Sequence, residues 1–249
     1  MRWRIFATRA STVSLWWSAY PNKKDSGIRP LVVGEILRAL VAKLALREVD
    51  HCLSVLQPLQ VAVGGKGPVI QAAILTLKSW VQDLRSDEII LKVDIANAYN
   101  TISRDACPSG VAKFCPDLMR WARWCLNGSS KVFFGADVID CETGVQQGDP
   151  LAPMLFSVGI HAVIEELLTV PELNEIWFLD DGVCRGKYEV VLKAFQIMKA
   201  KLADIGLTIN SRKCEIYGPK SADPLPGFDG VPVVIDRDQW SYLGTPLCE

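Results

Sequence analysis

Two adjacent carboxylates, Asp180 and Asp181, offer the clearest chemistry in this sequence of 249 residues. Apolar and aromatic residues at 176–179 lead into the pair and Gly182 leads out of it, a pattern that predicts a β-hairpin with Asp-Asp at its tip. Taken alone, Asp-Gly is a common turn signal, and the pair is more typical of an ordinary solvated hairpin. A functional site requires a third carboxylate and phosphate-binding residues elsewhere in the chain.

A third carboxylate, Asp94, ends the apolar run 89–93, which predicts a buried strand. An N-cap for a following helix is the alternative role for Asp94 at this position. If the strand pairs with the hairpin, Asp94 lies beside Asp180 and Asp181, and three carboxylates that repel one another require cations. Oxygen ligands alone favour hard ions such as Mg²⁺. Two such ions, about 3.5–4 Å apart, activate an attacking hydroxyl and stabilise a leaving pyrophosphate.

The elements that must position these carboxylates alternate between strands and helices. Helical spacing or apolar content predicts helices at 34–49, 69–84, 118–126, 151–168 and 188–205, and strand-like runs lie at 31–33, 89–93, 131–134, 207–210 and 214–217. A closing hairpin is expected from 231–235 and 240–244. From Asp94 onward, this order predicts an α+β fold in which an antiparallel sheet is backed by two helices.

Two of the predicted helices carry specific packing expectations. The first has apolar residues at 36, 37, 40, 41, 44 and 45, and we expect this stripe to pack in the core. The helix at 151–168 is apolar nearly all round, so we expect it to lie against a sheet. Asp149 suits its N-cap and Pro150 its first helical position.

Composition excludes several classes of protein. The sequence is 49% hydrophobic and contains no run of about 18 apolar residues, so we expect a soluble protein without a membrane-spanning helix. Eight cysteines without a Cys-x-x-Cys pair, and only two histidines, argue against zinc and favour reduced thiols in an intracellular protein, in the cytoplasm or nucleus.

The charge is unevenly distributed along the chain: residues 1–50 hold nine Lys/Arg against four Asp/Glu, whereas the remainder holds 18 Lys/Arg against 24 Asp/Glu. A basic first segment suits an anionic partner.

Six short motifs, in order, resemble those of reverse transcriptases. Within that family they resemble the enzymes of non-LTR (LINE-type) retrotransposons. The resemblance covers about residues 23–247. The motifs are Arg29-Pro-Leu-Val32, Val93-Asp94-Ile-Ala-Asn-Ala-Tyr99, Gln147-Gly-Asp-Pro-Leu-Ala-Pro153, Phe178-Leu-Asp180-Asp181, Gly206-Leu-Thr-Ile-Asn210 followed by Lys213, and Tyr242-Leu-Gly244.

The resemblance implies catalytic roles for four residues. Asp94 and Asp180 would be the principal ligands of two Mg²⁺ (or Mn²⁺) ions, with Asp181 third in the cluster. Lys213 would be a general acid for the leaving pyrophosphate.

The resemblance also implies a set of substrate-binding residues. Tyr99 would exclude a ribose 2′-OH and so select deoxynucleotides, and residues 242–244 would belong to a primer grip. Arg29, with Lys23 or Lys24, would hold the triphosphate, for which a guanidinium fork is well suited. Gln147 and Gly148 would line the incoming nucleotide and the template.

In architecture, the resemblance implies the fingers and palm of a right-hand polymerase. Fingers would occupy 1–85, the first carboxylate motif of the palm 86–102, a fingers or palm insert 103–146, and the palm with the Asp-Asp hairpin and primer-grip-like end 147–249. No thumb, endonuclease or RNase H segment is visible in the 249 residues, and such segments are expected in a longer polyprotein.

The leading hypothesis is therefore an RNA-templated DNA polymerase that adds dNTPs to a DNA or RNA primer on an RNA template, with no membrane partner. The alternative is a truncated, catalytically inactive retroelement relic that binds RNA or protein. A nucleotide cyclase on a similar palm is disfavoured, because Tyr99, Gln147 and Gly148 would have no role in it.

Overall fold

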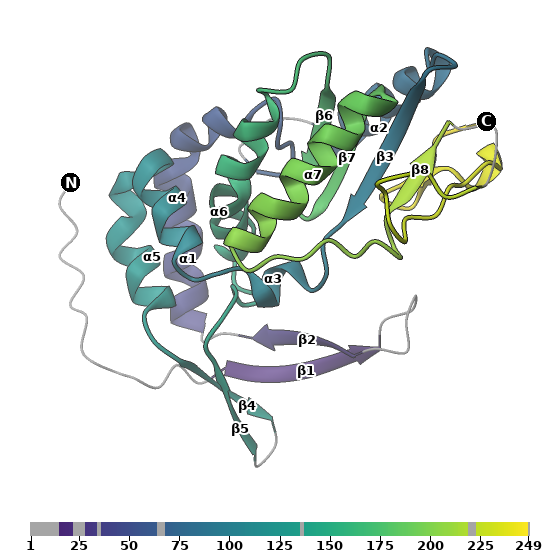
Figure 1. Cartoon of the computed structure of the whole chain (residues 1–249). Coiled ribbons are helices and arrows are strands. Elements are labelled where there is room, and N and C mark those ends of the chain that lie inside the picture. Colours follow the sequence, from purple (N-terminus) through teal and green to yellow (C-terminus); the bar gives the residue numbers. More distant parts are fainter. Residues whose placement is uncertain are drawn as a thin grey trace.

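The computed structural model describes residues 15–21, 28–33, 36–63, 68–134, 137–218 and 223–248, which form a mixed α/β fold (Figure 1). The helices are α1 (Ile36–Val49), α2 (Val69–Gln82), α3 (Ala98–Thr101), α4 (Ala106–Phe114), α5 (Met119–Leu126), α6 (Ala152–Leu167) and α7 (Tyr188–Asp204). Short 3-10 turns lie at Asp50–Leu56, Pro116–Leu118 and Arg237–Gln239. In the described part of the chain, no helix combines the length and apolarity needed to cross a membrane.

A four-stranded antiparallel sheet, in the order β6-β7-β3-β8, carries the predicted carboxylates. Its strands are β3 (Glu88–Asp94), β6 (Asn174–Phe178), β7 (Asp181–Lys187) and β8 (Glu215–Tyr217). Strand β3 pairs with β7 along its whole length, and the last registered pair joins Asp94 to Asp181. The predicted antiparallel sheet is confirmed, and its register places two of the three carboxylates opposite each other.

Side chains are packed on both faces of this sheet. Leu91 and Val93 belong to the cluster that contains residues of α6 and α7, and α7 lies across this face of the sheet in Figure 1. Ile90, which points to the opposite face, packs with α2 and with residues near the end of the chain. A strand buried on both faces has an apolar run in place of strict alternation, which explains the sequence of β3.

A second sheet joins two distant parts of the chain. Its order is β2-β1-β4-β5, with β1 (Leu15–Pro21), β2 (Ile28–Val33), β4 (Ser130–Phe134) and β5 (Asp137–Cys141). Strand β1 pairs antiparallel with β2 and parallel with β4, so the first two strands share a sheet with β4 and β5. This sheet lies below the helices in Figure 1.

The packing expected for the first helix is wrong. The helix forms as α1, but four apolar side chains of the predicted stripe are 49–86% exposed: Ile36, Leu37, Leu40 and Leu44. The buried positions are Arg38, Ala42 and Val49. The inward face is set by the buried guanidinium of Arg38, which pairs with Asp149 at 2.7 Å.

The start of α6 also differs from the prediction. The helix begins at Ala152, so Asp149 is not its N-cap and Pro150 is not its first residue. Asp149 is used in the preceding turn, where its Oδ1 accepts a hydrogen bond of 2.9 Å from the Leu151 amide. We expected α6 to lie against a sheet; it is almost wholly buried, but its most extensive contacts are with α4 and α7.

The chain closes with a smaller hairpin than expected. Strand β9 (Ser241–Tyr242) pairs with β10 (Thr245–Pro246), and residues 231–235 are not its partner. They contribute an isolated bridge between Val233 and Ile216 of β8. The predicted pairing is wrong because the turn at Leu243 and Gly244, with φ of 48° and 78°, folds the chain back at once.

Candidate active site

The three predicted carboxylates meet at one end of the central sheet. Asp94 is the last residue of β3, and Asp181, the first residue of β7, lies opposite it in the register. Asp180 occupies the two-residue turn that joins Phe178 of β6 to Asp181, since those two residues are the last registered pair of the hairpin. The predicted juxtaposition of Asp94 with the Asp-Asp pair is therefore present.

The turn itself has an uncommon backbone conformation. Leu179, its first residue, has φ of 59°. A two-residue hairpin often has a positive φ at this position but normally carries glycine there. A left-handed conformation costs a residue with a side chain about 1–2 kcal/mol, so neighbouring groups must stabilise the turn. Strained backbone of this kind tends to occur at functional sites.

Gly182 follows the pair for a reason that the turn signal did not predict. It lies within β7, and a Cβ atom at this position would come within 2.5–2.7 Å of the Trp177 ring. Glycine is therefore required by the close approach of a buried indole and not by the turn. The Asp-Gly dipeptide is no evidence here for a simple solvated turn.

Asp94 is held through its backbone by the segment before β8. Its amide donates to Cys214 Sγ at 3.3 Å, and its carbonyl accepts from the Asn210 amide at 2.8 Å. Burial raises the pKa of the Cys214 thiol to about 11, so the sulfur remains protonated at neutral pH. Lys213 lies in the turn between these two residues, with an exposed side chain close in sequence to both contacts of Asp94.

Tyr99 lies beside the carboxylates, on α3. Its ring stacks on Phe156 with centroids 4.9 Å apart and planes 10° from parallel. Burial raises the pKa of the Tyr99 hydroxyl, and the negative charge of Asp180 raises it further. The Tyr99 ring is thus packed against Phe156 and lies near enough to Asp180 to be affected by its charge.

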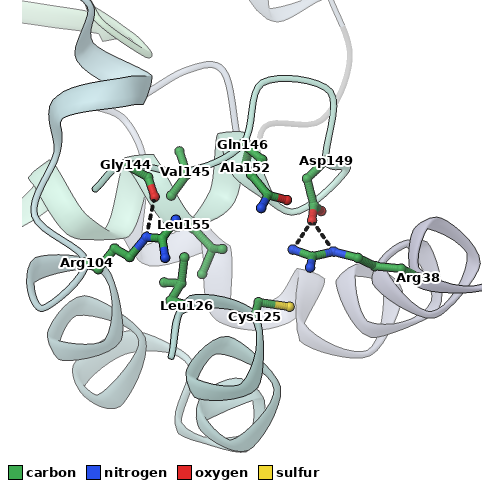
Figure 2. A pocket seen from close by; sticks show the side chains of 10 residues that line it. All are labelled: Arg38, Arg104, Cys125, Leu126, Gly144, Val145, Gln146, Asp149, Ala152 and Leu155. Carbon is green, nitrogen blue, oxygen red and sulfur yellow. Dashed lines mark hydrogen bonds and ion pairs between the residues drawn. The ribbon is translucent and has the colours of Figure 1, made fainter. Parts of the chain in front are cut away.

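The loop that carries Gln147 and Gly148 is held at both ends, and Figure 2 shows the contact at the end formed by Asp149. At one end, the Val145 amide donates to the Tyr99 carbonyl at 2.7 Å. At the other end, Asp149 Oδ2 accepts two hydrogen bonds from Arg38, at 2.7 and 2.9 Å. The two predicted substrate residues thus lie between an attachment to Tyr99 and a buried ion pair.

Arg38 is a functional candidate that the sequence prediction missed. Its side chain and that of Asp149 are only 8% and 9% exposed. The sequence does contain a second stripe with helical spacing, at positions 38, 42, 45 and 49, and this stripe could have indicated the buried face of the helix. Choosing that stripe over the more apolar one requires knowing that Asp149, 111 residues away, supplies the opposite charge.

A small cavity of about 10 Å³ lies behind this loop, lined by Arg38, Arg104, Gly144, Gln146 and Asp149 among others (Figure 2). It has space for about one water molecule and not for a nucleotide. Arg104 Nε donates to the Gly144 carbonyl at 3.2 Å, and burial lowers the pKa of this guanidinium. The side chains that line the cavity therefore hold the loop, and the cavity itself is too small to be a substrate site.

The predicted triphosphate-binding residues lie largely beyond the described part of the chain. Lys23 and Lys24 fall outside the described residues. Arg29 belongs to β2, where its backbone pairs with Tyr20, but its side chain is not described. Their role in phosphate binding stays a prediction.

The donor set at the site suits a hard divalent cation. Asp94 and Asp181 face each other and Asp180 adjoins them, so the oxygen ligands that Mg²⁺ or Mn²⁺ prefers are together, and a cation would relieve their repulsion. Within the described residues, however, no three His, Cys, Asp or Glu side chains are arranged closely enough to form a ready metal site. Holding metal would require side-chain adjustment at these three aspartates.

Comparison with known proteins agrees with this geometry. Residues 21–247 match the family described as "Reverse transcriptase (RNA-dependent DNA polymerase)". The chain is 28% identical to the retrotransposable element SLACS 132 kDa protein of Trypanosoma brucei gambiense, over 84% of this chain and 18% of that protein. It is also 28% identical to the Pol polyprotein of the type-2 retrotransposable element R2DM of Drosophila melanogaster, over 60% of this chain and 16% of the polyprotein.

Solved structures show a similar fold at low sequence identity. Telomerase from Candida albicans, in complex with a fragment of telomeric RNA, superposes with a TM-score of 0.63 at 11% identity, over 87% of this chain and 43% of that chain. Apo telomerase from Candida tropicalis, truncated from its C-terminal domain, gives a TM-score of 0.61 at 11% identity, over 84% of this chain and 50% of that chain. The chain thus spans less than a third of each curated relative, and about half or less of the telomerase chains.

Proposed function

The chain belongs to the reverse transcriptase (RNA-dependent DNA polymerase) family, and from that premise we propose that it is the catalytic domain of a retroelement and copies an RNA template into DNA. The observation that carries the proposal is the pairing of Asp94 with Asp181, next to Asp180 in the adjoining turn. A non-LTR element is supported by the resemblance to the SLACS and R2 proteins.

In the proposed reaction, Asp94, Asp180 and Asp181 would hold two Mg²⁺ (or Mn²⁺) ions, which would supply activation of the primer 3′-OH and stabilisation of the charge on the leaving pyrophosphate. Lys213 donates a proton to the pyrophosphate as it leaves. Asp94 and Asp181 lie opposite each other in the β3–β7 ladder, which fixes the backbone positions of these two carboxylates.

Substrate selection falls to the residues around the carboxylates. The Tyr99 ring, held by stacking on Phe156, blocks the space that a ribose 2′-OH would occupy. Gln147 and Gly148 line the nucleotide and template. Lys23, Lys24 and Arg29 bind the triphosphate, in a role consistent with the basic character of residues 1–50.

In this proposal the central sheet, with the helices over it, is the palm, and the segment up to residue 85 forms the fingers. Within residues 103–146, strands β4 and β5 share a sheet with β1 and β2, which supports the placement of this segment as an insert that completes the fingers. The thumb and any endonuclease would come from other parts of a longer polyprotein. The template is RNA, the primer DNA or RNA, the substrates are dNTPs, and the location is cytoplasmic or nuclear.

Primer extension on an RNA template tests the proposal. The purified chain, alone and joined to the thumb of a relative, should incorporate dNTPs in the presence of Mg²⁺ or Mn²⁺, and Asp180→Asn should abolish incorporation. If neither form of the wild-type chain incorporates dNTPs, the polymerase assignment is wrong.

A non-catalytic relic that binds RNA or protein is the second candidate. It is favoured by the lack of a ready three-ligand metal site among the described residues and by the near-neutral net charge of −1. Salt-dependent RNA binding without Mn²⁺ binding at Asp94 and Asp180 would support it over the polymerase.

A further inference from the structure

One side chain connects the end of the chain to the backbone of the Asp-Asp turn. Tyr242, on β9, donates a hydrogen bond of 3.0 Å from its hydroxyl to the Asp181 carbonyl, 61 residues away in sequence. The residue is only 1% exposed and belongs to the cluster formed by α2 and one face of the central sheet. Because β9 is not a strand of that sheet, this contact is independent of the β-ladder.

The surroundings of the hydroxyl show where it lies relative to the turn. The hydroxyl contacts the carbonyl of Asp181, the residue that directly follows Asp180 and that pairs with Phe178 across the hairpin. Phe178 and Asp181 are the pair that closes the two-residue turn. The Tyr242 hydroxyl therefore lies beside the closing pair and close to both carboxylates.

This turn is a place where an added hydrogen bond has a particular effect. Leu179 is held at φ of 59°, a conformation that a residue with a side chain disfavours. The backbone angles of residues 179–181 set the directions of the Asp180 and Asp181 side chains. Two adjacent carboxylates facing a third repel one another, which favours any rotation of the turn that separates them.

We propose that Tyr242 is a positioning residue, whose hydroxyl holds the Leu179–Asp180 turn in the orientation that keeps Asp180 and Asp181 directed toward Asp94. This inference rests on the proposed function, since the alignment of the carboxylates matters because they hold metal. Tyr242 acts on the turn through the hydrogen bond from its hydroxyl to the Asp181 carbonyl.

The test substitution is Tyr242→Phe, which removes the hydroxyl and keeps the ring. Tyr217→Phe is a matched control, because Tyr217 is also 1% exposed and lies in the same cluster. The Tyr217 hydroxyl donates to the Glu215 carboxylate, lies 3.3 Å from the Ser241 carbonyl oxygen and accepts from the Ser241 amide at 3.4 Å, and so contacts the backbone of β9 and not the turn. Both variants lose one buried hydroxyl with its carbonyl contact.

Three measurements on the full chain separate positioning from general stability. Hydrogen–deuterium exchange of the peptide containing residues 176–183 reports on the turn, urea unfolding reports on stability, and calorimetric titration with Mn²⁺ reports on the carboxylates. We expect faster exchange at 176–183 and a Mn²⁺ affinity lower by about three- to tenfold in Tyr242→Phe, the range for losing one hydrogen bond. Tyr217→Phe should match the wild type in both, and Mn²⁺ binding should be lost in Asp94→Asn.

The outcomes distinguish this inference from the proposed function. Wild-type exchange and Mn²⁺ affinity in Tyr242→Phe overturn the positioning role, and equal losses in both Tyr variants also overturn it, because the effect is then general. If the wild-type chain binds no Mn²⁺ and extends no primer, the proposed function fails. In that case, exchange at 176–183 alone still decides whether Tyr242 holds the turn.

Discussion

Breaking the buried ion pair between Arg38 and Asp149 should strongly destabilise the protein. Substitution of Arg38 by Met keeps much of the side-chain volume but leaves the Asp149 carboxylate without its partner, where its side chain is only 9% exposed. Removing one member of a buried pair typically costs about 3–5 kcal/mol, because an uncompensated charge stays away from water. The loss includes both hydrogen bonds to Oδ2, at 2.7 and 2.9 Å.

This cost is a large part of the stability of a single domain, which is about 5–15 kcal/mol. For a chain of this size, each 1 kcal/mol lowers the melting temperature by about 2–4 °C, so Arg38→Met should lower it by about 6–20 °C. Because Asp149 adjoins Gln147 and Gly148, we also expect a higher KM for dNTPs in whatever fraction remains folded.

A double-mutant cycle in urea provides the assay. Asp149→Asn removes the charge but keeps an oxygen that accepts from the Leu151 amide. The variant that carries both Arg38→Met and Asp149→Asn should therefore be more stable than the sum of the two single losses predicts, with a coupling energy of about 2 kcal/mol or more. The control is Lys113→Met, which breaks a pair with Glu165 at 2.6 Å whose side chains are 56% and 35% exposed. That change should cost about 1 kcal/mol or less. Equal losses at the two pairs, or no coupling in the cycle, would refute the reasoning.

Three further predictions concern the site and its sheet. Gly182→Ala should lower the free energy of unfolding in urea by about 1–3 kcal/mol and reduce primer extension, because the added Cβ meets the Trp177 ring. The control is Gly128→Ala, whose Cβ meets nothing within 4 Å and which should cost only about 1 kcal/mol of backbone strain. Equal costs for the two variants would contradict the packing argument. Burial raises the pKa of Glu175 to about 7, above its unfolded value of about 4.3, so its contribution to stability is full below about pH 4.3 and is lost as pH rises to about 7. Over that range the free energy of unfolding should fall by up to about 1.4 kcal/mol per pH unit, and this pH dependence should disappear in Glu175→Gln. If urea unfolding at several pH values shows the same dependence in the variant, Glu175 is not its source. Tyr99→Ala should raise the ratio of ribonucleotide to deoxynucleotide kcat/KM by about tenfold or more, and an unchanged ratio would remove Tyr99 as the gate.

The sequence predicted those parts of the fold that depend on local patterns. The apolar run of β3, the Asp-Asp hairpin and the buried α6 follow from residue spacing within one segment, and all three are present. The meeting of Asp94 with the hairpin was predictable because an antiparallel sheet places the end of one strand beside the start of its partner.

The rest depends on contacts between segments far apart in the chain. The orientation of α1 follows from an ion pair across 111 residues, which no local periodicity reports. Gly182 resembles a turn signal because sequence does not reveal the indole of Trp177 beside it. Likewise, the contact between Tyr242 and the Asp181 carbonyl becomes visible only when β9 is placed next to the hairpin.

Addition of a single nucleotide to a primer on an RNA template tests the central claim most directly. The wild-type chain should add a matched dNTP only when Mg²⁺ or Mn²⁺ is present, and Asp94→Asn should remove that addition while melting like the wild type. Metal-independent addition by the wild-type chain, or addition that survives in Asp94→Asn, would contradict the assignment of Asp94, Asp180 and Asp181 as the metal-binding site of a polymerase.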